Sequence, residues 1–310
     1  MKKYLLSAIT IIAAGVLASC NQNDVENNSS DSKVEVKFSS NIVKVNTPKT
    51  KMSGNKWDKN DAIGIYMFES GTNIVVEEKS NIKYTTQSEG TIGSFTDAGN
   101  VIYFPDNGDK VCFMSYYPYT ENIINNIYKV DVSNQSNQSL IDLLHSYTGT
   151  LYDKTVTGKK VSLLFDHELT KININVKVGT GLVDSDLDDI IVTIEEFNTK
   201  ADFNLISGEI ENPTTISSIS PKKTNKVNDY VVSYESIVIP TNNPGVAHLK
   251  FDLNNSDGQN NDVFKWSFNG TTLLKGTEYT YNVTINRSGI VVEAEINNWG
   301  EGGNINIDAE

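Results

Sequence analysis

The sequence predicts an all-β protein built from β-sandwiches. Short runs in which apolar and polar residues alternate recur along the chain from Val34 to Ile296. A period of two places one face of each run in a core and the other in water. The runs are rich in β-branched and aromatic residues, and Asn, Asp, Gly and Ser separate them. Helical periodicity is scarce, and we expect only Ser139–His145 to form a short helix.

The N-terminal residues have the features of an export signal. Lys2 and Lys3 precede an uncharged, mostly apolar run from Tyr4 to Leu17. This run is shorter than the roughly 20 residues that span a bilayer, and it suits a signal peptide. Leu17, Ala18, Ser19 and Cys20 then match the lipobox of bacterial lipoproteins. We expect residues 1–19 to be a lipoprotein signal peptide and Cys20 to carry the lipid; a plain signal with a chance cysteine is the less favoured alternative.

The remaining chain divides into a tether and a series of strands. Residues 20–33 are rich in Asn, Ser and Asp, which cannot form a core, and are expected to be flexible. The predicted strands follow at Val34–Phe38, Ala62–Phe68, Val101–Phe104, Val111–Tyr117, Ile172–Val178, Ile190–Ile194, Tyr279–Ile285 and Ile290–Ile296. Similar lengths lie on either side of Lys171, so we expect one sandwich domain over 34–170 and another over 171–310.

Composition excludes some partners. The formal net charge is −13, which disfavours nucleic acid and anionic membrane surfaces. The chain has two cysteines, so lipidation of Cys20 would leave Cys112 alone and no disulfide framework. Cys112 lies in the predicted strand Val111–Tyr117 and is expected to be a small buried hydrophobic residue.

We find no motif for an enzyme or a cofactor site. Metalloprotease, nucleophile-elbow and phosphate-loop motifs are missing, and the three histidines are far apart in sequence. Asp184, Asp186 and Asp188 have the one-three-five spacing of a calcium loop, with Glu195 at the twelfth position. However, Asp189 stands where that loop needs glycine. A solvated acidic turn is therefore favoured over a calcium site, and no metal or cofactor is expected.

Seven segments, in this order and spacing, resemble the fimbrillin-like lipoproteins of Bacteroidales type V pili. They are Trp57–Tyr66, Ser115–Tyr119, Asp142–Leu144, Leu164–Ile172, Ile237–Pro240, Leu274–Tyr281 and Ile296–Trp299. The resemblance implies two transthyretin-like β-sandwich domains in tandem. The residues themselves suit structural roles: the aromatic side chains fill cores and rims, Pro118 closes a strand, and Gly276 suits a tight turn. His167 is expected to hydrogen-bond locally.

The resemblance also implies assembly by strand exchange, in which a protease removes the first strand and a neighbouring subunit replaces it. Here the first strand would be Val34–Val45, which we expect at an edge of the N-terminal domain. Family members of the shaft often carry an arginine after it, but Arg287 is the only arginine in this chain. Lys49 and Lys51 are therefore the candidate processing sites.

The favoured function is a non-enzymatic structural or adhesive pilus subunit, as anchor, tip or minor pilin. Its expected partners are other pilin subunits through strand exchange, the outer membrane through lipid on Cys20, and a host or bacterial surface ligand. It would be lipid-anchored in the cell outer membrane and exposed at the surface. One alternative is a surface glycan-binding lipoprotein of a nutrient-uptake system, which a cluster of tryptophans on one loop face would favour. A hydrolase is a weaker alternative, since no motif supports it.

Overall fold

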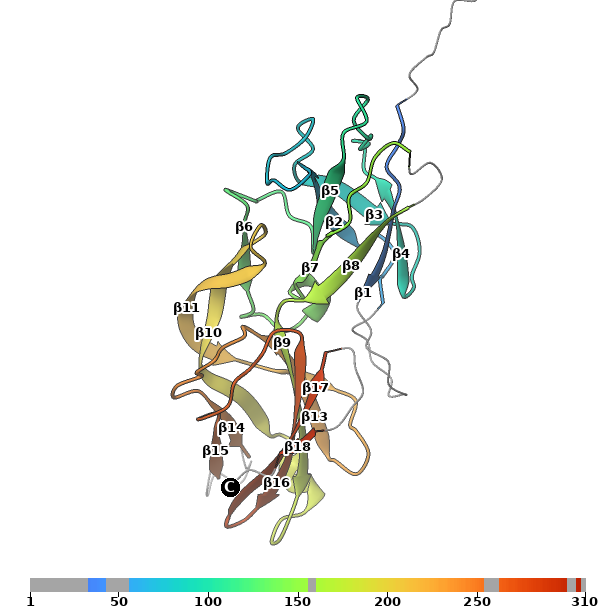
Figure 1. The fold of residues 1–310 in the computed structure, drawn as a ribbon. Coiled ribbons are helices and arrows are strands. Elements are labelled where there is room, and N and C mark those ends of the chain that lie inside the picture. The colour runs from blue at the N-terminus through green and yellow to red at the C-terminus, as the bar shows by residue number, and fades with distance from the viewer. Residues whose placement is uncertain (1–32, 43–55, 156–159, 254–261, 300–304, 308–310) are drawn as a thin grey trace, which may run out of the picture. The chain divides into compact units, whose positions relative to one another are not determined.

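The computed structural model describes residues 33–42, 56–155, 160–253, 262–299 and 305–307. Lys33–Glu310 form one compact unit. Its regular structure is almost entirely strand, which confirms the all-β prediction (Figure 1). Within the described ranges, no helix has the length and apolar character needed to cross a membrane.

Seven strands of the first half close into a barrel, in the hydrogen-bonded order β1-β4-β3-β2-β5-β7-β8. The strands are β1 (Phe38–Ile42), β2 (Ala62–Glu69), β3 (Ile82–Thr86), β4 (Ile92–Asp97), β5 (Val111–Tyr117), β7 (Leu144–Tyr147) and β8 (Val161–His167). β1 closes the sheet because it pairs antiparallel with β4 on one side and parallel with β8 on the other.

Two further sheets form a sandwich. One contains β11 (Glu209–Ile219), β10 (Ile191–Asn204), β14 (His248–Asp252) and β15 (Val263–Ser267), with β6 (Ile127–Asp131) also paired to β10. The other has the order β12 (Lys222–Thr224), β13 (Val232–Val238), β9 (Thr170–Val178), β16 (Thr277–Asn286), β17 (Gly289–Asn298) and β18 (Ile305–Ile307). Buried residues of both sheets, such as Ile174 and Phe251, belong to one hydrophobic cluster.

The two hydrophobic clusters explain the apolar patterns. Along β8, Val161, Leu163 and Phe165 are fully buried and alternate with exposed residues, so only one face meets the barrel core. β5 is buried at every position. Phe113 points into the barrel cluster, whereas Met114 belongs to the larger cluster that extends through the second half. A strand with both faces covered therefore reads as a continuous apolar run.

β6 links the two halves of the unit. It precedes Lys171 in the chain, yet it pairs antiparallel with β10, from Lys200↔Asp131 to Asn204↔Ile127. β14 pairs with the preceding residues of β10, from Ile191 to Glu195. The division at Lys171 stays a proposal, and the sheet pairing crosses it.

Two local predictions are wrong. Ser139–His145 is not a helix: Gln138–Leu140 form one 3₁₀ turn, and Leu144 already starts β7. The segment is too short to be a stable α-helix alone, and pairing with β5 and β8 outweighs its helical pattern. Val101–Phe104 is also not a regular strand, because Tyr103 makes only a single bridge, to Glu35.

Candidate functional site

β1 occupies a slot between β4 and β8. Phe38 to Asn41 pair with Phe95 to Ile92 of β4, and Phe38 to Ile42 pair with Val161 to Phe165 of β8. The prediction that the first strand is a sheet edge is therefore wrong. An alternating pattern reports how many faces of a strand are buried, but it carries no information on how many of its edges are paired.

The inward side chains of this segment are buried in the barrel core. Val36, Phe38, Ser40 and Ile42 have exposed fractions of 0, 1, 0 and 5%. The Phe38 ring meets Tyr84 and Phe113 edge-on, at centroid distances of 5.1 and 5.2 Å. Val36 and Phe38 of the predicted run Val34–Phe38 are therefore buried as expected, and Val34 is half-buried against the same core. The buried row fixes the register of β1 because a shift by one residue would expose it.

Gly93 is the close-packed point of the slot. It is the β4 partner of Ser40, and both residues face the core. A β-carbon at position 93 would lie 2.6 Å from Ser40 Oγ and 2.7 Å from the Phe95 ring. Sequence reasoning missed this residue, although a lone glycine between Ile92 and Ser94 in a strand pattern is a known signal of close backbone approach.

The predicted modification sites cannot be placed in this geometry. Cys20 lies outside the described residues, as do Lys49 and Lys51 and the last three residues of the predicted strand Val34–Val45. Lipidation of Cys20 and cutting at the two lysines therefore stay predictions. Cys112 is described, and its exposed fraction of 2% confirms that it is a buried hydrophobic residue.

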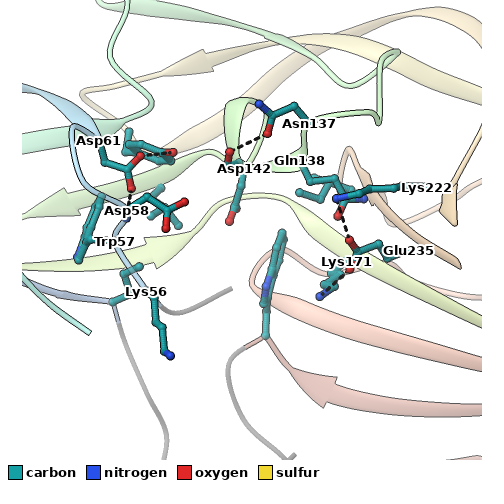
Figure 2. A pocket seen from close by; sticks show the side chains of 16 residues that line it. Lys56, Trp57, Asp58, Asp61, Asn137, Gln138, Asp142, Lys171, Lys222 and Glu235 are labelled. Carbon is teal, nitrogen blue, oxygen red and sulfur yellow. Dashed lines mark hydrogen bonds and ion pairs between the residues drawn. The ribbon is translucent and has the colours of Figure 1, made fainter. Parts of the chain in front are cut away.

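A cleft of about 410 Å³ is the second candidate site (Figure 2). Three of the ionic side chains that line it pair with one another. Lys171 and Lys222 lie 3.5 and 3.7 Å from the carboxylate oxygens of Glu235. Asp61 accepts hydrogen bonds from the Asp58 backbone N–H at 2.7 Å and from Tyr117 Oη at 3.2 Å, while burial raises the pKa of its carboxyl.

His167 makes local contacts near the cleft, as predicted. Its Nδ1 lies 2.9 Å from Asp142 Oδ1, and its ring stacks on Trp299 at 4.1 Å between centroids. Gly276 has a φ of +63° and leads into β16, and its N–H donates to Leu169 O. These contacts hold the junction between β8 and the terminal hairpin.

The predicted acidic turn is a 3₁₀ turn over Asp184–Leu187, in which Asp186 accepts a hydrogen bond from the Val183 N–H. Glu195, the twelfth position of the alternative calcium loop, is on β10; it is hydrogen-bonded to His248 Nε2 and forms ion pairs with Lys250 and Lys265. Among the described residues, no three acidic, histidine or cysteine side chains are grouped to hold a metal ion.

The tryptophans do not form an exposed platform for a sugar. Trp57 and Trp299 are 1 and 6% exposed. Trp266 packs against Phe268 and Tyr281, at 5.3 and 4.9 Å between ring centroids. The feature that would favour glycan binding is therefore not present at these three positions.

Comparisons with known proteins find similar fimbrial and cell adhesion proteins. The model of the fimbrillin-like family matches residues 50–299. The "putative fimbrium subunit Fim1C" of Bacteroides uniformis is 33% identical over the whole length of both chains. A solved "putative cell adhesion protein" of the same species is 31% identical, with a TM-score of 0.71 over 87% of this chain and 99% of its own.

A more distant structure shows the same fold. The tip fimbrial protein Mfa3 of Porphyromonas gingivalis is 9% identical, and it has a TM-score of 0.52 over 86% of this chain and 100% of its own. The family match covers more than half of the residues, and the resemblance expected from seven sequence segments is confirmed. The chain belongs to the fimbrillin-like family.

Proposed function

We propose that the protein is a non-enzymatic structural or adhesive subunit of a surface pilus, as anchor, tip or minor pilin, and that it assembles by exchange of β1. Family membership and the fimbrial and adhesion names of its relatives support the pilus role. Lipid on Cys20 would anchor it in the outer membrane, exposed at the cell surface. Its partners would be other pilin subunits and a ligand on a host or bacterial surface.

One observation carries the exchange step: β1 is paired along both edges and buries an apolar row. Its loss would leave unpaired backbone groups on β4 and β8, and such edges recruit another strand. Burying Val36, Phe38 and Ile42 contributes roughly 1.5–3 kcal/mol each. An empty slot would therefore be unstable, which favours filling it with a strand from another subunit.

Lys49 and Lys51 are proposed as the sites where this strand is released. They lie between β1 and β2 in the chain, so a cut at either lysine separates β1 covalently from the other six strands of the barrel. The matching stretch contains lysine and no arginine, which favours slower cutting than in arginine-bearing shaft subunits.

The test compares the chain with and without residues 34–51. The truncated form is expected to oligomerise, or to bind a labelled peptide that copies residues 33–42, while the intact form stays monomeric. A peptide with Phe38→Asp and Ile42→Asp is the matched control and should not bind, because it would place two charges in the barrel core. A truncated form that remains a stable monomer and binds no peptide would show that strand exchange is wrong.

A further inference from the structure

We propose that the slot between β4 and β8 selects its donor strand by the size of one residue, the one opposite Gly93. The slot would admit alanine or serine there and reject larger side chains. This inference rests on the proposed exchange of β1 and specifies the partner: an extended strand with apolar residues at the positions of Phe38 and Ile42 and a small residue midway between them.

The register of β1 defines the selecting position. Ser40 is the residue paired with Gly93, and its side chain is fully buried. The space there is so limited that even a β-carbon on Gly93 would approach Ser40 Oγ to 2.6 Å. Glycine is needed at 93 for this space and not for its backbone angles, since its φ is not in the left-handed region.

The neighbouring aromatic side chains keep this space small. The Phe95 ring would lie 2.7 Å from a β-carbon at Gly93, and it is itself only 5% exposed. Trp57 packs against Phe95 edge-on at 5.2 Å, and it also contacts Tyr117 and Phe165 at 5.4 and 5.3 Å. Trp57 therefore backs the Phe95 ring on one side, and close-packed interiors resist extra methylene groups.

Ser40 also weakens the binding of β1 in the slot. Its hydroxyl is buried and has no hydrogen-bond partner among the described residues. A buried hydroxyl that loses its bond to water weakens the state that contains it. A donor strand with alanine at this position would fit the same space without a buried, unbonded hydroxyl. Exchange of β1 for such a strand would therefore be favourable.

The experiment uses the full chain with a site-specific protease sequence in place of residues 46–50, so that β1 can leave after the cut. Labelled peptides copying residues 33–42 are titrated against the cut protein, and binding is followed by fluorescence anisotropy. Relative to the native peptide, Ser40→Ala should bind roughly tenfold more tightly, and Ser40→Leu at least about tenfold more weakly. Ser39→Leu is the matched control on the opposite face and should bind within about twofold of native.

The outcomes separate the two proposals. Equal affinities of the Ala, Ser and Leu peptides would overturn size selection and leave strand exchange intact. Binding of none of them would overturn exchange and, with it, the selection rule. A second measurement needs no exchange: in the uncut chain, Ser40→Ala should raise the melting temperature and Ser40→Leu should lower it well below that of Ser39→Leu. Equal melting temperatures of the two leucine variants would also overturn the proposal.

Discussion

His145 shows how burial decides the charge of a single residue at the junction of the two halves. Its Nε2 lies 2.9 Å from Leu205 O, and its ring meets Phe203 edge-on. Burial lowers the pKa of His145 to about 4, and the Lys275 charge acts in the same direction, against the hydrogen bond to Leu205. Glu168 faces the same ring, with Oε1 3.9 Å from Nδ1, and is bonded to Lys275.

We predict that acid destabilises the protein through His145. The unfolded histidine has a pKa near 6.5 and the folded one about 4, so the folded state binds fewer protons. Neutral His145 therefore contributes roughly 2–3 kcal/mol to the free energy of unfolding. This contribution is fully present above about pH 6.5 and is lost as the pH falls towards 4. Glu168, whose pKa burial raises, changes in the opposite sense. Between pH 7 and 4.5, urea unfolding should show a smaller loss in the free energy of unfolding for His145→Gln than for the wild type. Equal losses would contradict this role of His145.

Gln135 connects the β6–β7 segment to β13. Its Nε2 donates to Val132 O at 2.6 Å and to Ile237 O at 2.9 Å, and its Oε1 accepts from the Ile237 N–H at 2.8 Å. Gln135→Leu removes these three bonds, together with the one that Gln138 Nε2 donates to Gln135 Oε1, and leaves buried backbone groups without partners. We expect a loss of roughly 2–4 kcal/mol in the free energy of unfolding, measured in urea. The exposed neighbour Asn134→Ala should change it by less than about 1 kcal/mol, and similar values for both variants would count against this role.

At the scale of elements, the sequence predicts strands well where a strand has one buried face. Ile172–Val178 and Tyr279–Ile285 alternate regularly and lie within β9 and β16. Continuous apolar runs such as Val111–Tyr117 were also predicted as strands, and β5 has these same bounds. Pairing partners were not predictable, because the bonds of β1 to β4 and β8 depend on residues more than 50 positions away.

The candidate site was predictable only in part. The alternation of Val34, Val36 and Phe38 is visible in the sequence; the structure buries Val36 and Phe38 and half-buries Val34. The role of Gly93 is not visible in the sequence, because it depends on the register that brings Ser40 opposite it. The same limit explains why β6 was not predicted. Its residues alternate only weakly, and it joins the second sheet by pairing with β10, about 70 residues further along the chain.

We predict that β6 stabilises the sheet of the second half through its buried face. Val130 is 4% exposed and belongs to the larger hydrophobic cluster, whereas Lys129 beside it is exposed and pairs with Asp202 at 2.6 Å. Val130→Ala should reduce the free energy of unfolding by roughly 1–3 kcal/mol, since it removes buried methyl groups. Lys129→Ala should cost less than about 1 kcal/mol, as is usual for an exposed ion pair. Chemical denaturation measures the free energy of unfolding of both variants, and equal losses would contradict the role of the buried face.

At the scale of the whole molecule, the predicted lipid anchor depends on one side chain, the thiol of Cys20. Cys20→Ala should abolish labelling of the protein by a palmitate analogue in cells and leave an unprocessed precursor. Cys112→Ala is the matched control, because Cys112 is the other cysteine and is buried. It should keep the label. Equal labelling of the wild type and Cys20→Ala would contradict lipidation at this position.

The shared core bears on the proposed division at Lys171. Tyr66, Met114 and Tyr116 lie on barrel strands, but they belong to the same hydrophobic cluster as Ile174 and Phe251 of the second half. β6 is also paired with β10 across this division. Two domains that share a core and a sheet in this way are expected to unfold together, because neither can expose its part of the interface without loss of apolar burial.

We therefore predict that fragments 34–170 and 171–310 are each less stable than the same residues in the intact chain. The first fragment would expose Tyr66 and Met114 and leave β6 without a partner, so it should aggregate or melt without a sharp transition. The second would lose the β6 edge of its sheet. Scanning calorimetry of the intact chain should give one transition, and circular dichroism of an equimolar mixture of the fragments should recover part of it. Two separate transitions, with each fragment melting as it does in the intact chain, would show that the halves fold independently.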